Sequence, residues 1–488
     1  APQGDPPSAF VSAGNAAKAQ EAQKGLEGLG PAERNELLAV GAVAWETIAE
    51  GNGVLIFCAT KRQCETTAEH LASLMCVPPA NGMQELRNSI ADEMAHTLAS
   101  LATPSSARSQ PPSQPSPAAK DEEILLVRLI REGLAYHHAA LSSEERIYVE
   151  DAFRAGACKV LCATSTLAAG VNLPARRVIF KKPYIGMPRN GPLDNIRYMQ
   201  MAGRAGRAGI DAKGEAILIS MNQAGFKPQD LATKVLGGKG APAKSCLVDG
   251  SRGMRQPMLE AVCSGSVRSP DDVQSYISCT LLAATESFQD TVATAAKSAL
   301  KWLCENRFLE WHEGSYVYEA TTLGRAVGLS GLGPQEGLTV YHDLLKARQG
   351  FVLGNDLHMV YQITPTDGIR PSANGWKVLY EIYERFDQMD LKVMEAVGVS
   401  VAFLQRKALG HSRRGSAQEA ETSRRACRLY AALVLRDLIQ EMPAQQVEEK
   451  FQISRGEVQR VQEQSGIFAS MVTSMCEKLG WADLEGLI

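Results

Sequence analysis

The sequence predicts an α/β domain, built on a parallel sheet with helices on both faces, followed by a winged-helix domain and all-helical domains. Short apolar runs alternate with helical patterns from Ile48 to Ser220. This alternation is typical of a parallel sheet that is covered on both faces. Beyond about Met221 the strand signals fade into amphipathic helices. One hairpin candidate, FLEWHEGSYVYEATTLG, follows a helix there, and this order indicates a winged helix.

Changes in composition divide the chain into five segments. Residues 1–30 contain few large apolar groups and are expected to be disordered. The Pro/Ser-rich stretch TPSSARSQPPSQPSPAAK indicates a surface-loop insertion in the first domain. The predicted segments are a disordered 1–30, an α/β lobe at 31–223 with an insertion at 78–120, a winged helix at 224–325, a helical domain at 326–425 and a helix-turn-helix-like domain at 426–488.

Individual elements of these domains have their own signals. PAERNELLAVGAVAWETIAEG has helical spacing and stops at Gly51, and SSEERIYVEDAFRAG indicates a capped helix. AQQVEEKFQISRGEVQRVQEQSGIF has the rhythm of a helix-turn-helix, with SRGE capping its second helix. A helical cap on the preceding domain is an equally good interpretation of this last stretch. Strands are expected in VLIFCA, LAYHHAAL, CKVLCATST, RRVIFKK and EAILIS.

Composition narrows the class of protein only a little. The formal net charge is −3, so nucleic-acid binding must come from local clusters of Lys and Arg. Eleven cysteines occur without a CxxC pair, which indicates reduced and mostly buried thiols in an intracellular protein. No apolar run approaches the roughly 20 residues that cross a bilayer, and the start lacks a signal peptide. Because the chain begins with Ala1 rather than Met, we expect a fragment or a processed chain.

Two glycine-rich stretches carry the chemistry. In QMAGRAGRAG, Arg204 and Arg207 place two rigid guanidinium groups near main-chain N–H groups, a geometry that suits a triphosphate. In TSTLAAGVNLPARR, Gly170 allows phosphates or a nucleic-acid backbone to approach the main chain. Taken singly, the first stretch is also compatible with a solvated turn, and the second with a tight connection between strands.

The order of the motifs favours one family. VLIFCATKRQCE, YHHAALSSEER, TSTLAAGVNLPARRVI and QMAGRAGRAGID resemble motifs four, four-a, five and six of the second RecA-like lobe of superfamily-two DNA-repair helicases. Stretches such as ARQGFVLGNDLHMVYQITP extend the resemblance over most of residues 34–488, to a branch that acts in end-joining repair of double-strand breaks. The resemblance implies a nuclear, ATP-dependent 3′–5′ DNA helicase or translocase that binds single-stranded or forked DNA.

The resemblance also assigns residues around ATP. It implies that ATP and magnesium are shared with a first RecA-like lobe. In motif six, Arg207 matches the arginine finger and Arg204 its partner, and both are the catalytic candidates. Such a finger contributes about 10³–10⁵ in rate in related phosphoryl-transfer enzymes. The residues assigned to ATP binding are Gln200, Gly203, Arg204, Arg207 and Gly170.

A second set of residues is assigned to DNA. Asn172 belongs to motif five, which in the family couples nucleotide state to the grip on the strand. The adjacent His137 and His138 suit a loop in which one ring packs and the other, His138, faces the cleft; Ala140 replaces the usual glycine there. A metal site is not expected, because the eight histidines are dispersed. The hydroxyls and N–H groups that suit DNA phosphates are those of Thr164, Ser165 and Thr166.

The stretch QRKALGHSRRGSAQEAETSRRACR is a basic segment. Without context such a segment is usually a solvated face. In related helicases the domain at 326–425 lays a ratchet helix along the single strand, so Arg413 and Arg414 are expected to contact phosphates. The basic residues of the segment are Arg406, Lys407, Arg413, Arg414, Arg424, Arg425 and Arg428.

Two functions from different classes remain open. An ATP motor needs a GxxxxGK[ST] phosphate loop and an acidic pair for magnesium, and the sequence contains neither. The chain is therefore either the C-terminal part of a longer helicase or a non-catalytic DNA-binding or annealing module. The two arginines of motif six favour the helicase, since they have no evident role without ATP. An RNA helicase is disfavoured by the resemblance of residues 340–488 to DNA-repair proteins.

Overall fold

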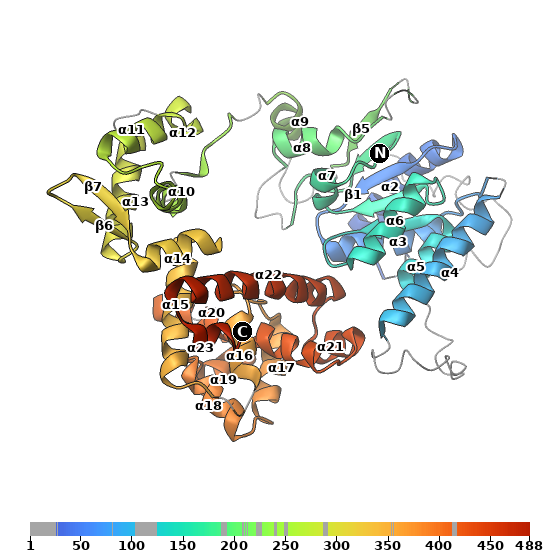
Figure 1. Ribbon diagram of the computed structural model, residues 1–488. Coiled ribbons are helices and arrows are strands. Elements are labelled where there is room, and N and C mark those ends of the chain that lie inside the picture. The colour runs from blue at the N-terminus through green and yellow to red at the C-terminus, as the bar shows by residue number, and fades with distance from the viewer. Residues whose placement is uncertain are drawn as a thin grey trace. The chain divides into compact units, whose positions relative to one another are not determined.

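The computed structural model divides the chain into two units, Ala1–Ala241 and Pro242–Ile488 (Figure 1). All structural statements below concern the described residues. These are 26, 28–80, 82–102, 124–186, 193–206, 209, 211, 213–220, 227–238, 242–247, 252–285, 291–352, 354, 356–411 and 417–488.

The first unit contains a five-stranded parallel sheet, as predicted. Strands β1, β2 and β3 are buried along their whole length and, apart from His137 at the end of β2, consist of apolar and aromatic residues, because helices cover the sheet. In the register of the central strands, Val54 lies between Val160 and Arg177. The strand order is β2 (Leu134–His137), β3 (Val160–Ala163), β1 (Val54–Phe57), β4 (Arg177–Phe180) and β5 (Glu215–Leu218).

Eight helices accompany this sheet among the described residues. Helix α3 contacts β2 and β3, and α2 contacts β1 and β4. Helix α6 begins with a capping box in which Ser142 and Glu145 bond each other's backbone, as the sequence predicted. The helices are α2 (Pro31–Ala49), α3 (Lys61–Leu74), α4 (Met83–Ala102), α5 (Leu125–Glu132), α6 (Ser143–Arg154), α7 (Thr166–Gly170), α8 (Asn195–Ala202) and α9 (Pro228–Leu236).

The insertion predicted at 78–120 differs from the structure. Its first part is helix α4, whose Ala91, Met94 and Leu98 are buried in the core of the unit. Arg87 of the same helix is buried and donates to the carbonyls of Ala157 and Val77, at 2.8 and 3.0 Å. The Pro/Ser-rich part, from residue 103 onward, lies outside the described residues.

The expected disordered segment, 1–30, falls almost entirely on residues that the structure does not describe. Residues 26 and 28–30 are the exceptions, and among them Leu26 and Leu29 pack against the hydrophobic core of the first unit. The core therefore recruits side chains that precede the first long helix, α2.

The first half of the second unit contains the predicted hairpin. Strands β6 (Leu309–His312) and β7 (Val317–Ala320) pair antiparallel after helix α13. This order, a helix followed by a short β-wing, is that of a winged helix. The helices are α10 (Arg252–Cys263), α11 (Pro270–Ser278), α12 (Leu281–Thr285), α13 (Ala293–Glu305) and α14 (Thr322–Ser330).

Helices and the loops between them make up the rest of the second unit, which contains no strand among its described residues. Helix α22 begins with the predicted capping box, formed by Ser454 and Glu457. Its start contributes Val458 to the core around α16 and α20, whereas its end contributes Val472 to the core around α10, α13 and α14. One long helix therefore joins both cores of the unit. The helices are α15 (Pro334–Gln349), α16 (Asp356–Ile363), α17 (Ala373–Tyr383), α18 (Gln388–Ala396), α19 (Val401–Ala408), α20 (Ala417–Ile439), α21 (Ala444–Phe451), α22 (Arg455–Leu479) and α23 (Ala482–Glu485).

Gly133 is expected to be essential for the packing of helix α4 against the rest of the unit. Its φ is +84°, and a Cβ there would lie 2.6 Å from Cζ of Arg87, which its hydrogen bonds hold in place. Gly133→Ala should therefore lower the free energy of unfolding of this unit by about 3 kcal/mol, through the left-handed backbone and the loss of the Arg87 bonds. Urea unfolding monitored by hydrogen exchange of the sheet peptides measures this loss.

Gly51 provides the matched control. Its φ is +81°, but a Cβ there would meet nothing within 4 Å. Gly51→Ala should cost only the backbone contribution, about 1 kcal/mol. Equal losses in the two variants would show that Arg87 does not fix α4.

Candidate functional site

The direction of the strands separates the motifs into two groups. Because all five strands are parallel, loops that follow strands lie at one edge of the sheet and loops that precede them lie at the other. Thr164 follows β3, and His138 follows β2, so both lie at the carboxyl edge. Asn172 and Arg176 precede β4 and lie at the amino edge. Residues that the sequence placed in one motif are therefore found at opposite edges.

The carboxyl edge presents hydroxyl groups. Thr164 and Ser165 are half-buried, and Thr166 at the start of α7 is exposed. The hydroxyls of Thr164 and Thr166 are hydrogen-bonded to each other at 2.8 Å. The three predicted phosphate-binding residues are thus together and reachable by a ligand.

Both histidines are buried, whereas His138 was expected to face the cleft. His138 is 1% exposed, and its Nε2 lies 2.9 Å from Oε1 of Glu65 on α3. His137 is buried as well, and its Nε2 lies 3.1 Å from Oε1 of Glu150. Burial lowers the pKa of His137. Both rings are buried and contact carboxylates, so in this structure His138 joins the end of β2 to α3.

The amino edge contains a cleft of about 720 Å³. Arg204 lies in its wall, and its guanidinium donates to the carbonyl of Ala168, at 2.5 Å, and to Oδ1 of Asn172, at 3.4 Å. The backbones of the two motifs also meet, because Ala175 N–H donates to the Arg204 carbonyl at 2.9 Å. Motif five and motif six are therefore held together at this cleft, both by side chains and by main chain.

The glycines of motif six allow this close contact. Gly206 has a φ of +90°, and a Cβ there would lie 3.2 Å from the backbone of Gly214. Gly206 N–H donates to the Ala175 carbonyl at 2.7 Å. Only glycine combines this conformation with such a close approach of two backbones.

The other residues assigned to ATP are partly described. Gly203 lines the cleft, whereas Gln200 is exposed on α8 and Gly170 is exposed at the end of α7, without lining it. Arg207 lies outside the described residues, as do Arg413 and Arg414. Among the described residues, no group of His, Cys, Asp and Glu side chains could hold a metal ion.

The structure adds three cations that the sequence analysis missed. Arg154, Lys159 and Arg176 line the same cleft as Arg204, and no described lining residue is acidic. Arg154 ends helix α6, and the other two residues immediately precede β3 and β4. In the sequence, Lys159 and Arg176 each stand directly before a strand. This pattern identifies a shared cleft only when the strands are known to be parallel and close together. The lining of the cleft is consequently cationic, and an anion there would compete with Asp151, which pairs with Arg154 at 2.5 Å, and with Glu215, 3.8 Å from Arg176.

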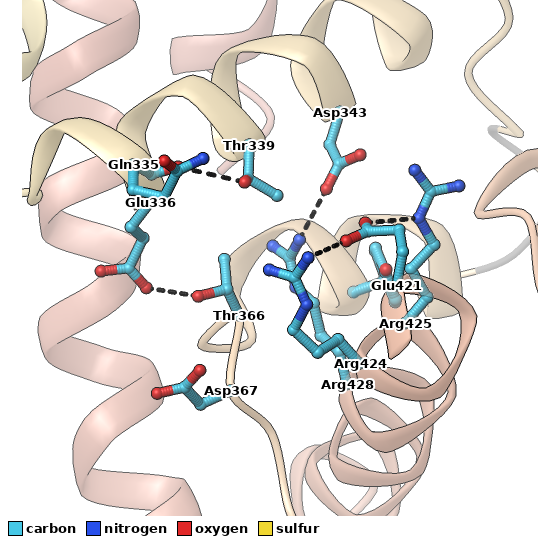
Figure 2. Close-up of a pocket in the computed structure, with 11 residues that line it drawn as sticks. Gln335, Glu336, Thr339, Asp343, Thr366, Asp367, Glu421, Arg424, Arg425 and Arg428 are labelled. Carbon is cyan, nitrogen blue, oxygen red and sulfur yellow. Dashed lines mark hydrogen bonds and ion pairs between the residues drawn. The ribbon is translucent and has the colours of Figure 1, made fainter. Parts of the chain in front are cut away.

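The basic segment is less available than its sequence suggests. Figure 2 shows Arg424 and Arg425 turned toward Glu421, and Arg425 Nε lies 3.0 Å from Oε1 of that carboxylate. Arg428 is 2% exposed. It donates to the carbonyls of Thr364 and Gln362 and pairs with Asp343 at 2.9 Å. Arg428 therefore stabilises the helical core and is not part of a solvated face.

Comparisons with known sequences agree with this geometry. A helicase conserved C-terminal domain matches residues 117–209, and a helix-turn-helix domain matches residues 214–310. The helical domain of the DNA polymerase theta helicase-like region matches residues 334–488. The three matches follow one another along the chain in the order that the sequence analysis predicted.

Full-length relatives cover most of the chain. DNA polymerase theta of Mus musculus is 34% identical over 484 residues, 92% of this chain and 18% of the relative. The Homo sapiens protein named helicase POLQ-like is 29% identical over 439 residues, 87% of this chain and 37% of the relative. The chain belongs to the family of DNA polymerase theta and the POLQ-like helicases. The predicted fold class, a RecA-like lobe followed by winged-helix and helical domains, is confirmed with it.

A third relative covers a smaller share of the chain. A protein named ATP-dependent DNA helicase Hel308, from Methanocella arvoryzae, is 30% identical over 350 residues, 69% of this chain and 41% of the relative. The chain thus spans about a fifth of the mouse DNA polymerase theta, and less than half of the two helicases. Within the described residues, no helix is long and apolar enough to cross a membrane.

Arg428 is expected to be critical for the stability of the helical domain of this chain. Arg428→Met leaves Asp343, whose side chain is 16% exposed, without its partner. Removal of one member of a buried ion pair costs about 3–5 kcal/mol. Urea unfolding of the second unit should show that loss, and adding Asp343→Asn should recover part of it.

Arg424→Met is the control for this measurement. Its side chain is 57% exposed and pairs with Glu421, so the cost should stay below about 1 kcal/mol. The structural role assigned to Arg428 is wrong if both single variants unfold at the same urea concentration.

Proposed function

We propose that this chain is the C-terminal part of an ATP-dependent 3′–5′ DNA helicase or translocase. It would bind single-stranded or forked DNA in the nucleus, in end-joining repair of double-strand breaks. ATP and magnesium would be held jointly with a first RecA-like lobe of the same parent polypeptide. The family membership supports the helicase class, and the Hel308 relative is named as ATP-dependent.

The observation that carries the proposal is the position of Arg204. Its guanidinium reaches the carbonyl of Ala168 on α7 and Oδ1 of Asn172 while lining the cationic cleft. A phosphate that attracted this guanidinium would compete with the two oxygens that it now contacts. Binding and release of the γ-phosphate would therefore change the contacts that Arg204 makes with the motif-five loop.

Helix α7 connects that loop to the carboxyl edge. It starts at Thr166, beside the hydroxyl of Thr164, and ends at Gly170, two residues before Asn172. A displacement of its end by Arg204 would move the hydroxyl-bearing start, because a helix of one turn moves as a unit. This supplies a route from nucleotide state to the grip on a DNA phosphate.

The roles of the two arginines differ in this proposal. Arg207 acts as the finger that meets charge developing on the γ-phosphate, whereas Arg204 positions the motif-five loop. In the complete parent enzyme, Arg207→Ala should lower kcat of DNA-stimulated ATP hydrolysis by about 10³–10⁵. Arg204→Ala should weaken the stimulation by DNA more than it weakens hydrolysis without DNA, because the link to α7 is lost.

Arg197→Ala is the matched control. Arg197 lies on the same helix, α8, its side chain is 64% exposed, and it pairs with Asp194 rather than with the cleft. Its loss should leave kcat unchanged. If Arg207→Ala hydrolyses ATP at the rate of the Arg197 variant, the chain has no finger. The alternative, a DNA-binding or annealing module without a motor, would then be preferred.

The segment between α19 and α20 is proposed to contact the strand. It carries Arg413 and Arg414, and the arginines nearest to it in α20 are already paired with Glu421. Replacing both residues by Gln should reduce the slope of log K against log salt by about 1.4 for single-stranded DNA, since each phosphate contact contributes about 0.7.

Reversal of both charges to Glu is the companion variant. Its slope should fall further than that of the Gln pair, because each carboxylate repels a phosphate. Titrations of labelled single-stranded DNA into the full chain at several salt concentrations measure both slopes. A slope that is unchanged in the Glu variant would refute a phosphate contact at this segment.

A further inference from the structure

The β6–β7 hairpin carries a group of aromatic side chains with no evident role in the proposed helicase function. Trp311 and Tyr318 lie opposite each other in the strand pair, with ring centroids 4.6 Å apart. The ring of Tyr316, in the turn, meets Trp311 edge-on, at 6.0 Å and 78°. We call these three residues the wing aromatic cluster. The hairpin itself extends beyond α13 (Figure 1).

The core of the winged helix covers only the base of this aromatic face. Leu309 and Ala320 form the neighbouring pair on the same face and are buried. Trp311 and Tyr318 are half-buried, and Tyr316 is 68% exposed. The rings of Trp311 and Tyr316 therefore stand at a steep angle to each other. Among the described residues of this unit, the side of the cluster that faces away from the core is exposed.

The backbone conformation of Tyr316 is energetically unfavourable. Its φ is +53°, a conformation that favours Gly or Asn and is uncommon for a bulky residue. Burial does not repay this cost, because most of the side chain is exposed. A strained and exposed aromatic residue in a turn is more consistent with a binding role than with a folding role.

The charge around the hairpin decides what it can bind. Phe308–Ala320 contains Glu310, Glu313 and Glu319 and no Lys or Arg. Arg307 and Arg325 line the adjoining cleft together with Glu305, Glu310 and Glu319, so residues 305–325 keep four carboxylates against two guanidinium groups. Glu305 pairs with Lys301, and Glu319 lies 3.3 Å from His312. Glu310 and Glu319 directly adjoin Trp311 and Tyr318 in the sequence, within the roughly 8 Å Debye length of physiological salt. DNA phosphates would be repelled, whereas a cation would be attracted.

We propose that the wing aromatic cluster binds a lysine or arginine side chain from a basic segment of a partner protein. The cation would lie against the faces of Trp311 and Tyr316, and the neighbouring carboxylates would supply a favourable field. The same domain already contains such a contact, because Arg255 lies 4.0 Å from the ring centroid of Trp302. This inference does not depend on ATP hydrolysis or on DNA binding.

The test uses the full chain and a fluorescein-labelled peptide of lysine, serine and glycine, followed by fluorescence anisotropy. A twin peptide with Gln at every Lys position should lose binding. A third peptide, with trimethylated lysines, should bind at least as tightly as the first. Trimethylation removes hydrogen-bond donors but keeps the charge, so it separates cation–π contact from simple ion pairing.

Tyr316→Asn is the decisive variant, because asparagine tolerates the left-handed backbone and the hairpin should remain folded. It should weaken peptide binding about two- to fivefold, the range expected for loss of one exposed cation–π partner. Tyr276→Asn, at a 36% exposed tyrosine on α11, is the matched control and should bind like the unaltered chain.

Three results would overturn the proposal. Equal affinities for the Lys and Gln peptides would exclude recognition of the cation. Equal affinities of the Tyr316 and Tyr276 variants would exclude the cluster. Binding of an oligothymidine that Tyr316→Asn weakens, with no binding of the Lys peptide, would assign the rings to base stacking instead.

Discussion

The common direction of the five strands is the constraint on which the first unit depends. In the order β2-β3-β1-β4-β5, every strand points the same way, so the unit has a carboxyl edge and an amino edge with different chemistry. Hydroxyl groups gather at the first edge and cations at the second. Arg204 and the short helix α7 lie between them. In the proposed function, ATP and DNA would bind at separate edges, and helix α7 would connect them.

The second unit depends on a different kind of connection. Helix α22 contributes apolar side chains to two hydrophobic cores, so the winged helix and the helical bundle cannot be treated as independent domains. Arg428 adds a polar tie, because it joins α20 to α15 and to the end of α16 through Asp343, Thr364 and Gln362. The sequence boundary at residues 425 and 426 falls beside this tie, inside α20.

Much of the fold could be read from the sequence, because the β-strands are apolar runs bounded by clear helix signals. Helix α4 could not be recognised in the same way. Its apolar residues do recur at helical spacing, but they adjoin a Pro/Ser-rich stretch, and the reason for its position is Arg87, whose carbonyl partners lie at Val77 and Ala157. A buried arginine has the same appearance in a sequence as an exposed one. The same limit explains Arg428, which the sequence placed on a basic face.

The motifs of the candidate site could be predicted from the sequence, but the edge of the sheet at which each motif lies could not. Glycines and arginines identified motif six, but the close approach of Gly206 to the backbone of Gly214 was not predicted from the sequence. The separation of Asn172 from Thr164, and the burial of His138 against Glu65, depend on strand direction and on a helix that is distant in sequence. Arg154, Lys159 and Arg176 become one cationic group only through the fold.

The central claim is that the cationic cleft is half of a nucleotide site, completed by a lobe that this chain does not contain. The most direct measurement is the size of the native protein in an extract of the source cells, blotted with an antibody to the α15–α22 region. The account predicts a band far above 52.6 kDa, from a polypeptide with an upstream phosphate loop. A band at 52.6 kDa itself would contradict it and would leave a DNA-binding module without a motor.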